Sequence, residues 1–443
     1  MQRNRSRRFV MMEPWLDYRL QRPKHLGNSI MRIFVLTLLT YSLMFTSVEG
    51  AEWKSFRGPN GDGSTAAANV PASWDASSNI AWKVKLEGSG WSTPVMQDGN
   101  LYLTVARPSV SDGGNGYSLA TECVNTKDGK TVWSTEIFKQ GATAPGIHGK
   151  NSHASPTPLI HQDKIYVHFG HMGTACLSMD GQIQWKNDTV KYAPVHGNGG
   201  SPVIYKDNLI YSVDGAKQAF IVALDRNNGK EVWRFDRESN APRKFSFTTP
   251  LLIENEAGAQ VISPGSDVVH SLDPNNGELI WKVVYDGYSV IPKPIYDGKY
   301  VYICTGYNTP WIYVVDPTGK GDVTDTHVVW RSNKSIPHTP SLILNDGHLY
   351  MVSDRGIATC VEAHTGTVVW QERIGGNYSS SPVLAEGRIY FQSEAGLATV
   401  IRASTTFEKL GSNDIGERTL ASYAVDDGAI YLRSDKHLYK IAK

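Results

Sequence analysis

The chain has 443 residues, 40% of them hydrophobic, and its 44 lysine and arginine residues nearly balance 43 aspartate and glutamate residues. A formal net charge of +1 gives no electrostatic basis for nucleic acid or an anionic membrane surface as a partner. Length alone would suggest about three domains, but an internal repeat indicates one closed array.

Residues 1–50 are predicted to be a secretory signal region, with the signal proper at about 31–50. An apolar run, IFVLTLLTYSLMF, begins just after Met31, and small residues occupy cleavage-site positions before Ala51. The run is shorter than the roughly 20 residues that span a bilayer, so the sequence predicts export to the periplasm or extracellular space without a membrane-spanning segment. Translation could begin at Met1 or at Met31.

Residues 51–78 follow as an N-terminal arm, and from residue 79 to 443 the chain is built from one repeat. A complete copy, residues 199–235, contains four short runs rich in β-branched and aromatic residues, separated by polar or glycine-containing turns. This pattern is typical of a four-stranded antiparallel meander. Eight copies recur about every 47 residues, with first-strand anchors at Pro94, Pro158, Pro202, Pro250, Pro294, Pro340, Pro382 and Tyr423.

The two ends of the array are offset from each other. A strand at 79–86 precedes the first complete copy, and the last copy stops after its third strand. The sequence therefore predicts an all-β fold, an eight-bladed β-propeller in which the N-terminal strand completes the C-terminal blade and removes free edges. Seven fourth-strand tryptophans are predicted to be structural: Trp82, Trp133, Trp185, Trp233, Trp281, Trp330 and Trp370.

Four cysteines in an exported chain permit three complete disulfide pairings. Cys123, Cys176 and Cys360 occupy one slot of the third strand, where other blades have alanine or serine. Equivalent Cα atoms of sheets stacked about 10 Å apart are too distant for a disulfide. We therefore expect buried free thiols.

First strands of the type SPVI, combined with tryptophan strands of the type ALDRNNGKEVW, resemble the pyrroloquinoline quinone (PQQ)-like β-propeller repeat family. The arm sequence WKSFRGPNGDG is similar to that of secreted bacterial members. This family contains quinoprotein dehydrogenases and non-catalytic scaffolds, among them the propeller lipoprotein of the outer-membrane β-barrel assembly machinery. The chain is similar to that lipoprotein in size and blade count, but it has no cysteine for lipidation at the cleavage point.

The family's enzymes stack PQQ between a tryptophan and a disulfide of adjacent cysteines, with calcium held by Glu, Asn and Asp. No two cysteines are adjacent here, and the chain lacks the long insertions of those enzymes. The resemblance therefore implies no cofactor and no metal, with PQQ and calcium as the alternative. The expected partner is a small molecule, a glycan or an envelope protein, and the expected state is a monomer.

Residues just before each first strand should surround one mouth of the central channel, because first strands line that channel. This collar is rich in aromatic and imidazole groups, which suit a planar or anionic ligand; packing between blades is the alternative role. The predicted ligand-binding residues are Trp91, His153, His196, Tyr288, Asn308, His338, Tyr378 and Arg418, with Asp267, Asp354 and Glu394 as acidic loop residues. The histidines fall in blades too far apart to share one metal ion.

No sequence signature of a hydrolase nucleophile or zinc enzyme is present. The sequence therefore predicts an exported, non-catalytic binding or scaffolding propeller of the cell envelope, with no catalytic residues. A quinoprotein dehydrogenase, or another enzyme acting at the central channel, is the alternative.

Overall fold

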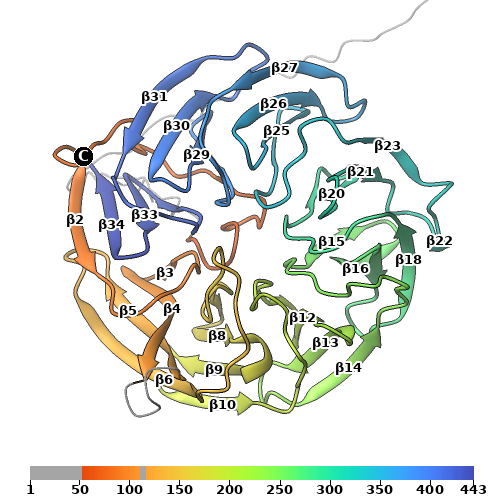
Figure 1. The fold of residues 1–443 in the computed structure, drawn as a ribbon, viewed down its shortest axis with the longest axis horizontal. Coiled ribbons are helices and arrows are strands. Elements are labelled where there is room, and N and C mark those ends of the chain that lie inside the picture. The colour runs from red at the N-terminus through yellow and green to blue at the C-terminus, as the bar shows by residue number, and fades with distance from the viewer. Residues whose placement is uncertain (1–51, 110–115) are drawn as a thin grey trace, which may run out of the picture. The chain divides into compact units, whose positions relative to one another are not determined.

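The computed structural model describes residues 52–109 and 116–443, so the predicted signal region and Ala51 lie outside the described residues. The described residues form a ring of eight antiparallel blades, a β-propeller, as the sequence predicted (Figure 1). The strands are rich in β-branched and aromatic residues, and polar or glycine-containing turns separate them. Among the described residues, helix is confined to one short turn, η2 (Gly170–Met172). Within this part of the chain, no helix combines the length and apolar character needed to cross a membrane.

The first four blades follow the chain in order. Blade one contains β3 (Val95–Gln97), β4 (Asn100–Ser109), β5 (Gly116–Asn125) and β6 (Thr131–Gln140). Blade two contains β7 (Leu159–His161), β8 (Lys164–His168), β9 (Thr174–Ser178) and β10 (Ile183–Asn187). Blade three contains β11 (Val203–Tyr205), β12 (Asn208–Asp214), β13 (Ala219–Asp225) and β14 (Glu231–Asp236). Blade four contains β15 (Leu251–Asn255), β16 (Gly258–Pro264), β17 (Val268–Leu272) and β18 (Leu279–Val284).

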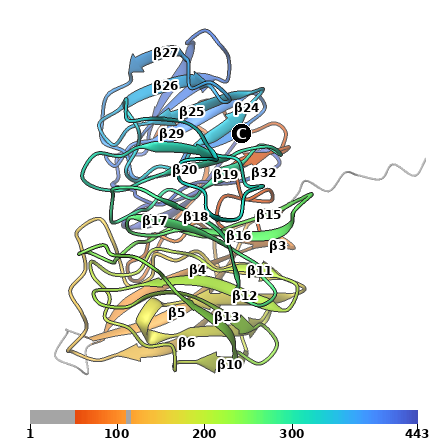
Figure 2. The ribbon, with the colours of Figure 1, turned by 90° about the vertical axis from the view of Figure 1, so that its right-hand side faces the viewer.

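The remaining blades complete the ring, which Figure 2 shows from its rim. Blade five contains β19 (Ile295–Tyr296), β20 (Val301–Cys304), β21 (Ile312–Val315) and β23 (Val328–Ser332). Blade six contains β24 (Ile343–Asn345), β25 (His348–Val352), β26 (Ile357–Glu362) and β27 (Val368–Arg373). Blade seven contains β28 (Val383–Ala385), β29 (Arg388–Gln392), β30 (Leu397–Arg402) and β31 (Lys409–Asp414). Blade eight contains β32 (Ala424–Asp426), β33 (Ala429–Arg433) and β34 (His437–Ala442).

The eighth blade confirms the predicted closure. Strand β2 (Ile80–Lys85) pairs antiparallel with β34, in the order β2-β34-β33-β32, so residues from the two ends of the ring share one sheet. One anchor in the sequence was placed wrongly. Ile343 pairs with Tyr350 as Val95 pairs with Tyr102, so the blade-six equivalent of Pro94 is Leu342, two residues after Pro340.

The repeated tryptophans join each blade to the next. Trp185 illustrates the contact: its indole Nε1 donates to the backbone oxygen of Arg226 in blade three at 2.9 Å. Its ring lies against Gly229, which has a φ of +74° and where an added Cβ would come within 2.5 Å of the indole. Only glycine therefore fits at that turn. Trp281 departs from this pattern and donates to Gln260 of its own blade, because an extra strand, β22 (Gly321–Asp322), pairs parallel with β18 and buries it.

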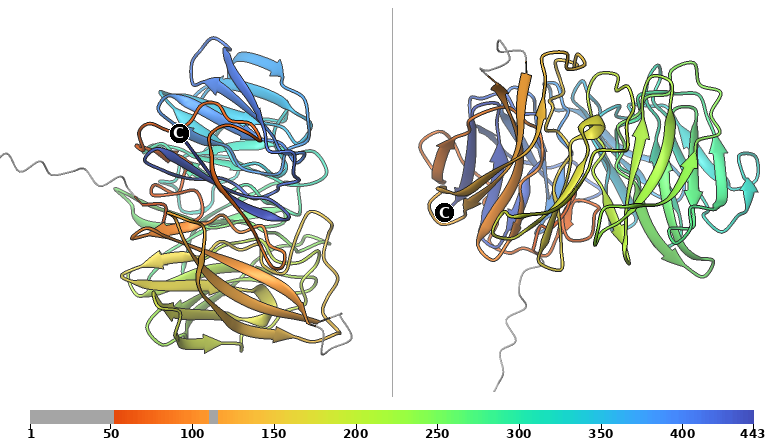
Figure 3. Two further views of the ribbon diagram at one scale, coloured as in Figure 1. Left: turned by 90° about the vertical axis from the view of Figure 1, so that its left-hand side faces the viewer. Right: turned by 90° about the horizontal axis from the view of Figure 1, so that it is seen from below.

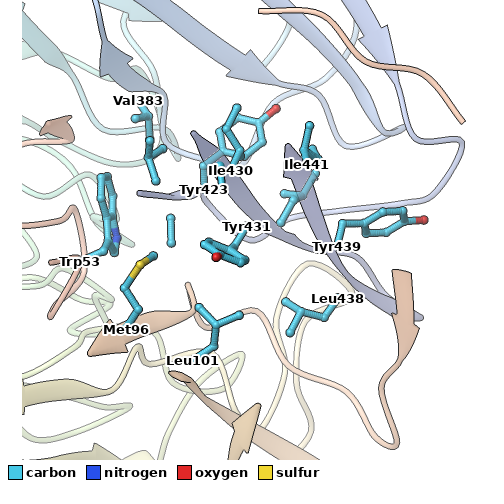
Figure 4. Close-up of a cluster of buried hydrophobic side chains, with 14 of the residues drawn as sticks. Trp53, Met96, Leu101, Val383, Tyr423, Ile430, Tyr431, Leu438, Tyr439 and Ile441 are labelled. Atoms are coloured by element: carbon cyan, nitrogen blue, oxygen red, sulfur yellow. The ribbon is translucent and has the colours of Figure 1, made fainter. Parts of the chain in front are cut away.

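The arm before β2 crosses one end of the central channel (Figure 1). The backbone oxygens of Trp53, Lys54, Gly63 and Ala68 accept hydrogen bonds from blades one, two, seven and eight, respectively, at 2.7 to 2.9 Å. Strand β1 (Ser64–Thr65) adds to blade seven in parallel with β28. Figure 4 shows Trp53 beside Met96 and Val383, in the hydrophobic cluster that also contains the core of blade eight.

All four cysteines are free and buried, as expected. Cys123, Cys176 and Cys360 each lie directly opposite the tryptophan of their blade across two paired strands. Burial raises the pKa of each of these three thiols to about 11.

Candidate functional site

A cavity of about 600 Å³ occupies the central channel on the side away from most of the arm. Figure 1 shows that the innermost ends of the blades surround the centre of the ring, and Figure 3 shows the ring edge-on from two further sides. Phe56 of the arm is the one described arm residue that lines the cavity. Since the arm crosses the opposite end of the channel, the cavity is a funnel with a floor.

A ring of hydroxyl side chains surrounds the channel near that floor. In every blade the ring position lies two residues before the first strand, so equivalent backbone places each side chain at the same level. The eight positions hold Thr93, Thr157, Ser201, Thr249, Lys293, Ser341, Ser381 and Ser422. Six of the hydroxyl residues, all except Thr93, line the cavity. We call these eight residues the hydroxyl ring.

Hydrogen bonds connect neighbouring members of the hydroxyl ring from blade to blade. The backbone N–H of Thr157 donates to Ser201 Oγ at 2.9 Å, and that of Ser201 donates to Thr249 Oγ1 at 2.9 Å. Four further bonds of the same kind, 3.0 to 3.1 Å long, continue the pattern. Each bond satisfies a buried amide at the blade boundary. These bonds hold the side chains of the hydroxyl ring in fixed positions.

Above the hydroxyl ring, six aromatic and imidazole rings follow one another around the wall of the funnel. Their centroids are 4.9 to 5.9 Å apart from one member to the next. We call this series the ring ladder; in order it consists of His148, His196, Phe245, Tyr288, Tyr307 and His338. Spacings in this range are those of favourable aromatic pairs. Five of the six rings, all except His338, line the cavity and present polarisable faces and edges to a ligand.

Charged groups surround the outer mouth. The Arg243 guanidinium lies over the Tyr288 ring at 4.7 Å, and Arg418 lies over Trp91 at 5.4 Å. Lys150 forms an ion pair with Glu394 at 2.6 Å, which connects the segment after blade one with blade seven. Arg418 also donates to the backbone oxygen of Gly149 at 2.7 Å. These contacts hold the segment 141–155 across part of the mouth.

Four of the predicted site residues line the cavity: Trp91, His196, Tyr288 and Asp354. Three others contact lining residues without lining it themselves. His338 ends the ring ladder next to Tyr307, Arg418 stacks on Trp91, and Glu394 binds Lys150 and accepts a hydrogen bond from Ser379. Burial lowers the pKa of His196, with His148 adding to the effect, so its imidazole is neutral at pH 7.

The other four predicted residues lie away from the cavity wall. His153 is 5% exposed and stacks on Tyr117 at 4.3 Å, while Tyr378 is 1% exposed within a blade contact. Asn308 is exposed outside the cavity lining. Asp267 accepts a hydrogen bond from the backbone N–H of Gly287 at 3.0 Å and thereby fixes its own loop.

Asp354 is the single carboxylate among the described residues that line the cavity. Its oxygens accept hydrogen bonds from the backbone of His338 at 2.7 Å and from the hydroxyl of Thr339 at 2.7 Å. Burial opposes its ionisation, but these hydrogen bonds outweigh burial and lower the pKa of Asp354. The carboxylate is therefore ionised and occupied with holding its own loop.

These groups do not fit calcium-bound PQQ. In the described part of the chain, no three His, Cys, Asp or Glu side chains lie together as a metal site needs. Asp354 has its oxygens engaged by its own blade, and the four cysteines are separately buried in the blades. No disulfide of adjacent cysteines can cover a quinone here.

Sequence reasoning missed the hydroxyl ring and the arm residue Phe56. A signal for the ring was present: threonine or serine directly precedes the anchor proline in five blades, at Thr93, Thr157, Ser201, Thr249 and Ser381. The repeat drew attention to the proline, and the residue before it was not considered. Phe56 offered no comparable signal, because the arm occurs once.

Comparison with known proteins places this geometry among related folds. A family model described as outer membrane protein assembly factor BamB matches residues 66–234, 217–317 and 311–436. Quinohemoprotein alcohol dehydrogenase ADH IIB of Pseudomonas putida is 25% identical over 176 residues. That match covers 38% of this chain, and the chain spans only 23% of the length of that curated relative.

Solved structures show the same fold at low identity. BamB from Moraxella catarrhalis superimposes with a TM-score of 0.56 and 14% identity, covering 82% of this chain and 99% of that one. Quinohemoprotein alcohol dehydrogenase from Comamonas testosteroni gives 0.62 and 13%, covering 88% and 80%. A europium-containing methanol dehydrogenase gives 0.61 and 12%, covering 87% and 90%. At these identities the similarity concerns the fold alone.

Proposed function

Because this chain belongs to the PQQ-like repeat family of outer membrane protein assembly factor BamB, we propose that it is a non-catalytic binding propeller, exported to the cell envelope, which holds a small ring-containing ligand in its funnel. The observation that carries this proposal is the ring ladder, six rings in edge-on or tilted contact, five of which line one cavity of about 600 Å³. A cavity of that size suits a small organic ligand.

The side chains of the funnel wall suit ligand binding better than catalysis. Tyr288 has its hydroxyl in a hydrogen bond with Arg243, and Asp354 is engaged by the backbone of its own blade. His196 offers a neutral imidazole to a ligand. Groups that are positioned by their own neighbours can select a ligand's shape. The imidazole Nδ1 of His338 lies 3.7 Å from Asp354 Oδ2, which is longer than the hydrogen-bond distance that proton transfer between an acid and a base requires.

An uncharged naphthylamine dye, N-phenylnaphthylamine, provides a direct test of the cavity. Phe247 also lines the cavity, beside Phe245 of the ring ladder. The mature chain should bind the dye saturably, with increased fluorescence, and the variant Phe247→Ala/Tyr288→Ala/Tyr307→Ala should lose most of that binding. Val132→Ala, a change at an exposed rim residue (56% exposed), is the control. Equal binding by the triple variant and the wild type would contradict a funnel site.

The dehydrogenase alternative is tested in the same preparations. The mature chain incubated with PQQ and calcium should show no dye-linked oxidation of alcohols or sugars. Turnover that saturates with added PQQ would overturn the non-catalytic proposal. A partner role as an assembly scaffold would instead be supported if a purified envelope protein were bound equally by the wild type and by the funnel variant.

A further inference from the structure

Two buried cations lie where the hydroxyl ring meets the arm. Lys293 is the one member of that ring without a hydroxyl; it is 6% exposed, and its Nζ donates to the backbone oxygen of Gly61 at 2.7 Å. Arg57 is 2% exposed, and Nη2 donates to the backbone oxygens of Asp62 and Leu342, each at 2.5 Å. Nη1 of Arg57 donates to the backbone oxygen of Pro382. Leu342 and Pro382 directly follow two members of the ring, so the Arg57 guanidinium lies next to the ring at blades six and seven.

These two charges are only partly compensated. Among the described residues, neither Arg57 nor Lys293 has a carboxylate oxygen within 4.0 Å, in contrast to the fully buried pair of Arg237 and Asp214 at 2.8 Å. Asp62, on the arm, is the acidic group that acts on both cations. Its Oδ1 accepts hydrogen bonds from the backbone and hydroxyl of Ser64. One carboxylate thus acts on two buried cations, and charge interactions are stronger in the protein interior than in water.

The hydroxyl ring adds donors on the cavity side. A hydroxyl has one O–H donor and two lone pairs. In Thr157, Ser201 and Thr249, one lone pair accepts the neighbouring blade's backbone N–H. Among the described residues, these three hydroxyls donate to no protein atom, so their O–H groups remain for a ligand. Donors above and cations below favour negative charge at the centre of the ring.

We propose that the hydroxyl ring, with Lys293 and Arg57 beneath it, is a subsite for an oxyanion, that is, a carboxylate, sulfate or phosphate group carried by the ligand. This inference rests on the proposed function, because the remainder of the ligand would lie against the ring ladder. Ring hydroxyls donate to the oxyanion, and the two cations stabilise its charge from below. The subsite defines the ligand class as an acidic ring compound, such as an aromatic acid or an acidic sugar.

Protonation of Lys293 should be linked to binding. Burial, with Arg57 as a further cause, lowers the pKa of Lys293 to about 7. The charged groups that act on it are Arg57 and Asp62, both on the arm. An anion above the ring favours the ammonium form and raises that pKa. Binding at pH 8 should therefore take up protons, and affinity should increase as the pH falls toward 7.

A pair of dyes that differ only in charge tests the subsite. Anilinonaphthalene sulfonate carries a sulfonate that its uncharged parent, N-phenylnaphthylamine, lacks. The wild type should bind the sulfonate at least about tenfold more tightly than the parent, as expected for a charge-assisted hydrogen bond. Lys293→Thr, which installs the side chain found in the equivalent position of other blades, should remove most of that preference and leave the parent's affinity unchanged. Lys127→Thr, the same change at an exposed lysine, should alter neither.

The outcomes separate the two proposals. Equal affinity for the two dyes in the wild type, or an equal loss of both in Lys293→Thr, would overturn the oxyanion subsite while the funnel proposal stands. Failure of both dyes to bind saturably would overturn both. If Lys293→Thr does not fold, Lys293→Met takes its place. Inorganic sulfate, phosphate and acetate provide an independent test, since ligands that bind the native state raise the melting temperature. These anions should raise the melting temperature of the wild type and leave that of Lys293→Thr unchanged.

Discussion

Trp74 of the arm stacks on Tyr390 of blade seven, with ring centroids 6.4 Å apart and planes inclined by 15°. In four other blades, a second-strand tyrosine makes the corresponding contact with the fourth-strand tryptophan of its own blade. Blade seven has Gly411 at the tryptophan position, opposite Val400. The arm therefore supplies the indole that the repeat lacks there, and it is part of the ring's packing.

Replacing Trp74 tests whether the arm takes the place of the missing blade-seven tryptophan. Trp74 is 3% exposed, so Trp74→Ala should cost roughly 3–5 kcal/mol of the free energy of unfolding and expose the arm to proteases. Adding Gly411→Trp should restore part of that stability by filling the slot from the strand. An unchanged midpoint of chemical denaturation in Trp74→Ala would contradict the structural role of the arm.

The tryptophan contacts between blades can be tested by replacing either the tryptophan or the glycine against which its ring lies. Trp233→Ala should cost roughly 3–5 kcal/mol because the side chain is almost fully buried. Gly277→Ala should also destabilise, since φ is +77° and the new Cβ would lie 2.6 Å from the Trp233 ring. Gly347→Ala is the matched control, with φ at +71° and open space around it, so it measures backbone strain alone. Equal losses in the two glycine variants, measured by denaturant titration, would show that the indole contact contributes nothing.

The four thiols should react only after unfolding. Burial raises the pKa of each cysteine, to about 11 for Cys123, Cys176 and Cys360, so the reactive thiolate is scarce in the folded protein. Ellman titration without reductant should find about four thiols in denaturant and close to none without it. Finding two in denaturant would mean that one pair is oxidised.

The repeat period and the turn residues made most of the propeller ring predictable from the sequence. The orientation of individual side chains near the channel was not predictable in this way. Each tryptophan sits at a constant place in its blade, so its role could be read from recurrence. The collar residues do not share such a place: Trp91 lies two residues before its ring position, but His196 and Tyr288 lie five before theirs. Loops of different length turn side chains in different directions, which is why His153 and Tyr378 point into the blades.

The arm could not be predicted for a different reason. Its contacts are made by one segment with partners in blades one, two, five, six, seven and eight, and no repeated sequence pattern indicates them. Composition indicated only that 51–78 lies on the ring. The oxyanion subsite depends on this unrepeated segment as well, since Arg57 comes from the arm and meets Lys293 only in the folded ring.

Acid should destabilise the protein through its buried histidines. Burial, followed by the charges of Arg237 and Lys282, lowers the pKa of His270 to about 2 from an ordinary 6.5. Between these values the unfolded chain binds one more proton than the folded protein, so stability falls as the pH decreases below about 6.5, by about 1.4 kcal/mol per pH unit. His270→Leu should therefore lose on the order of 2 kcal/mol less than the wild type between pH 7 and pH 5. Parallel pH profiles of the two proteins in denaturant titrations would refute this assignment.

Two deletions in the chain from residue 52 onward can separate the contribution of the closing strand from that of the arm. Removing residues 52–74 takes away the floor of the funnel and Trp74 but leaves β2 paired with β34 through contacts such as Lys83 with Tyr439 and Val84 with Leu438. Removing residues 52–88 also takes β2, so the backbone edge of β34 is left open to other chains. Both deletions should lower the melting temperature, because both remove buried indoles. Only the longer one should form oligomers that increase with concentration, as measured by light scattering after size-exclusion chromatography. If the longer deletion stays monomeric at every concentration and melts with the shorter one, the β2-β34 pairing does not close the ring in solution; oligomers in both would instead assign the protection of that edge to the arm.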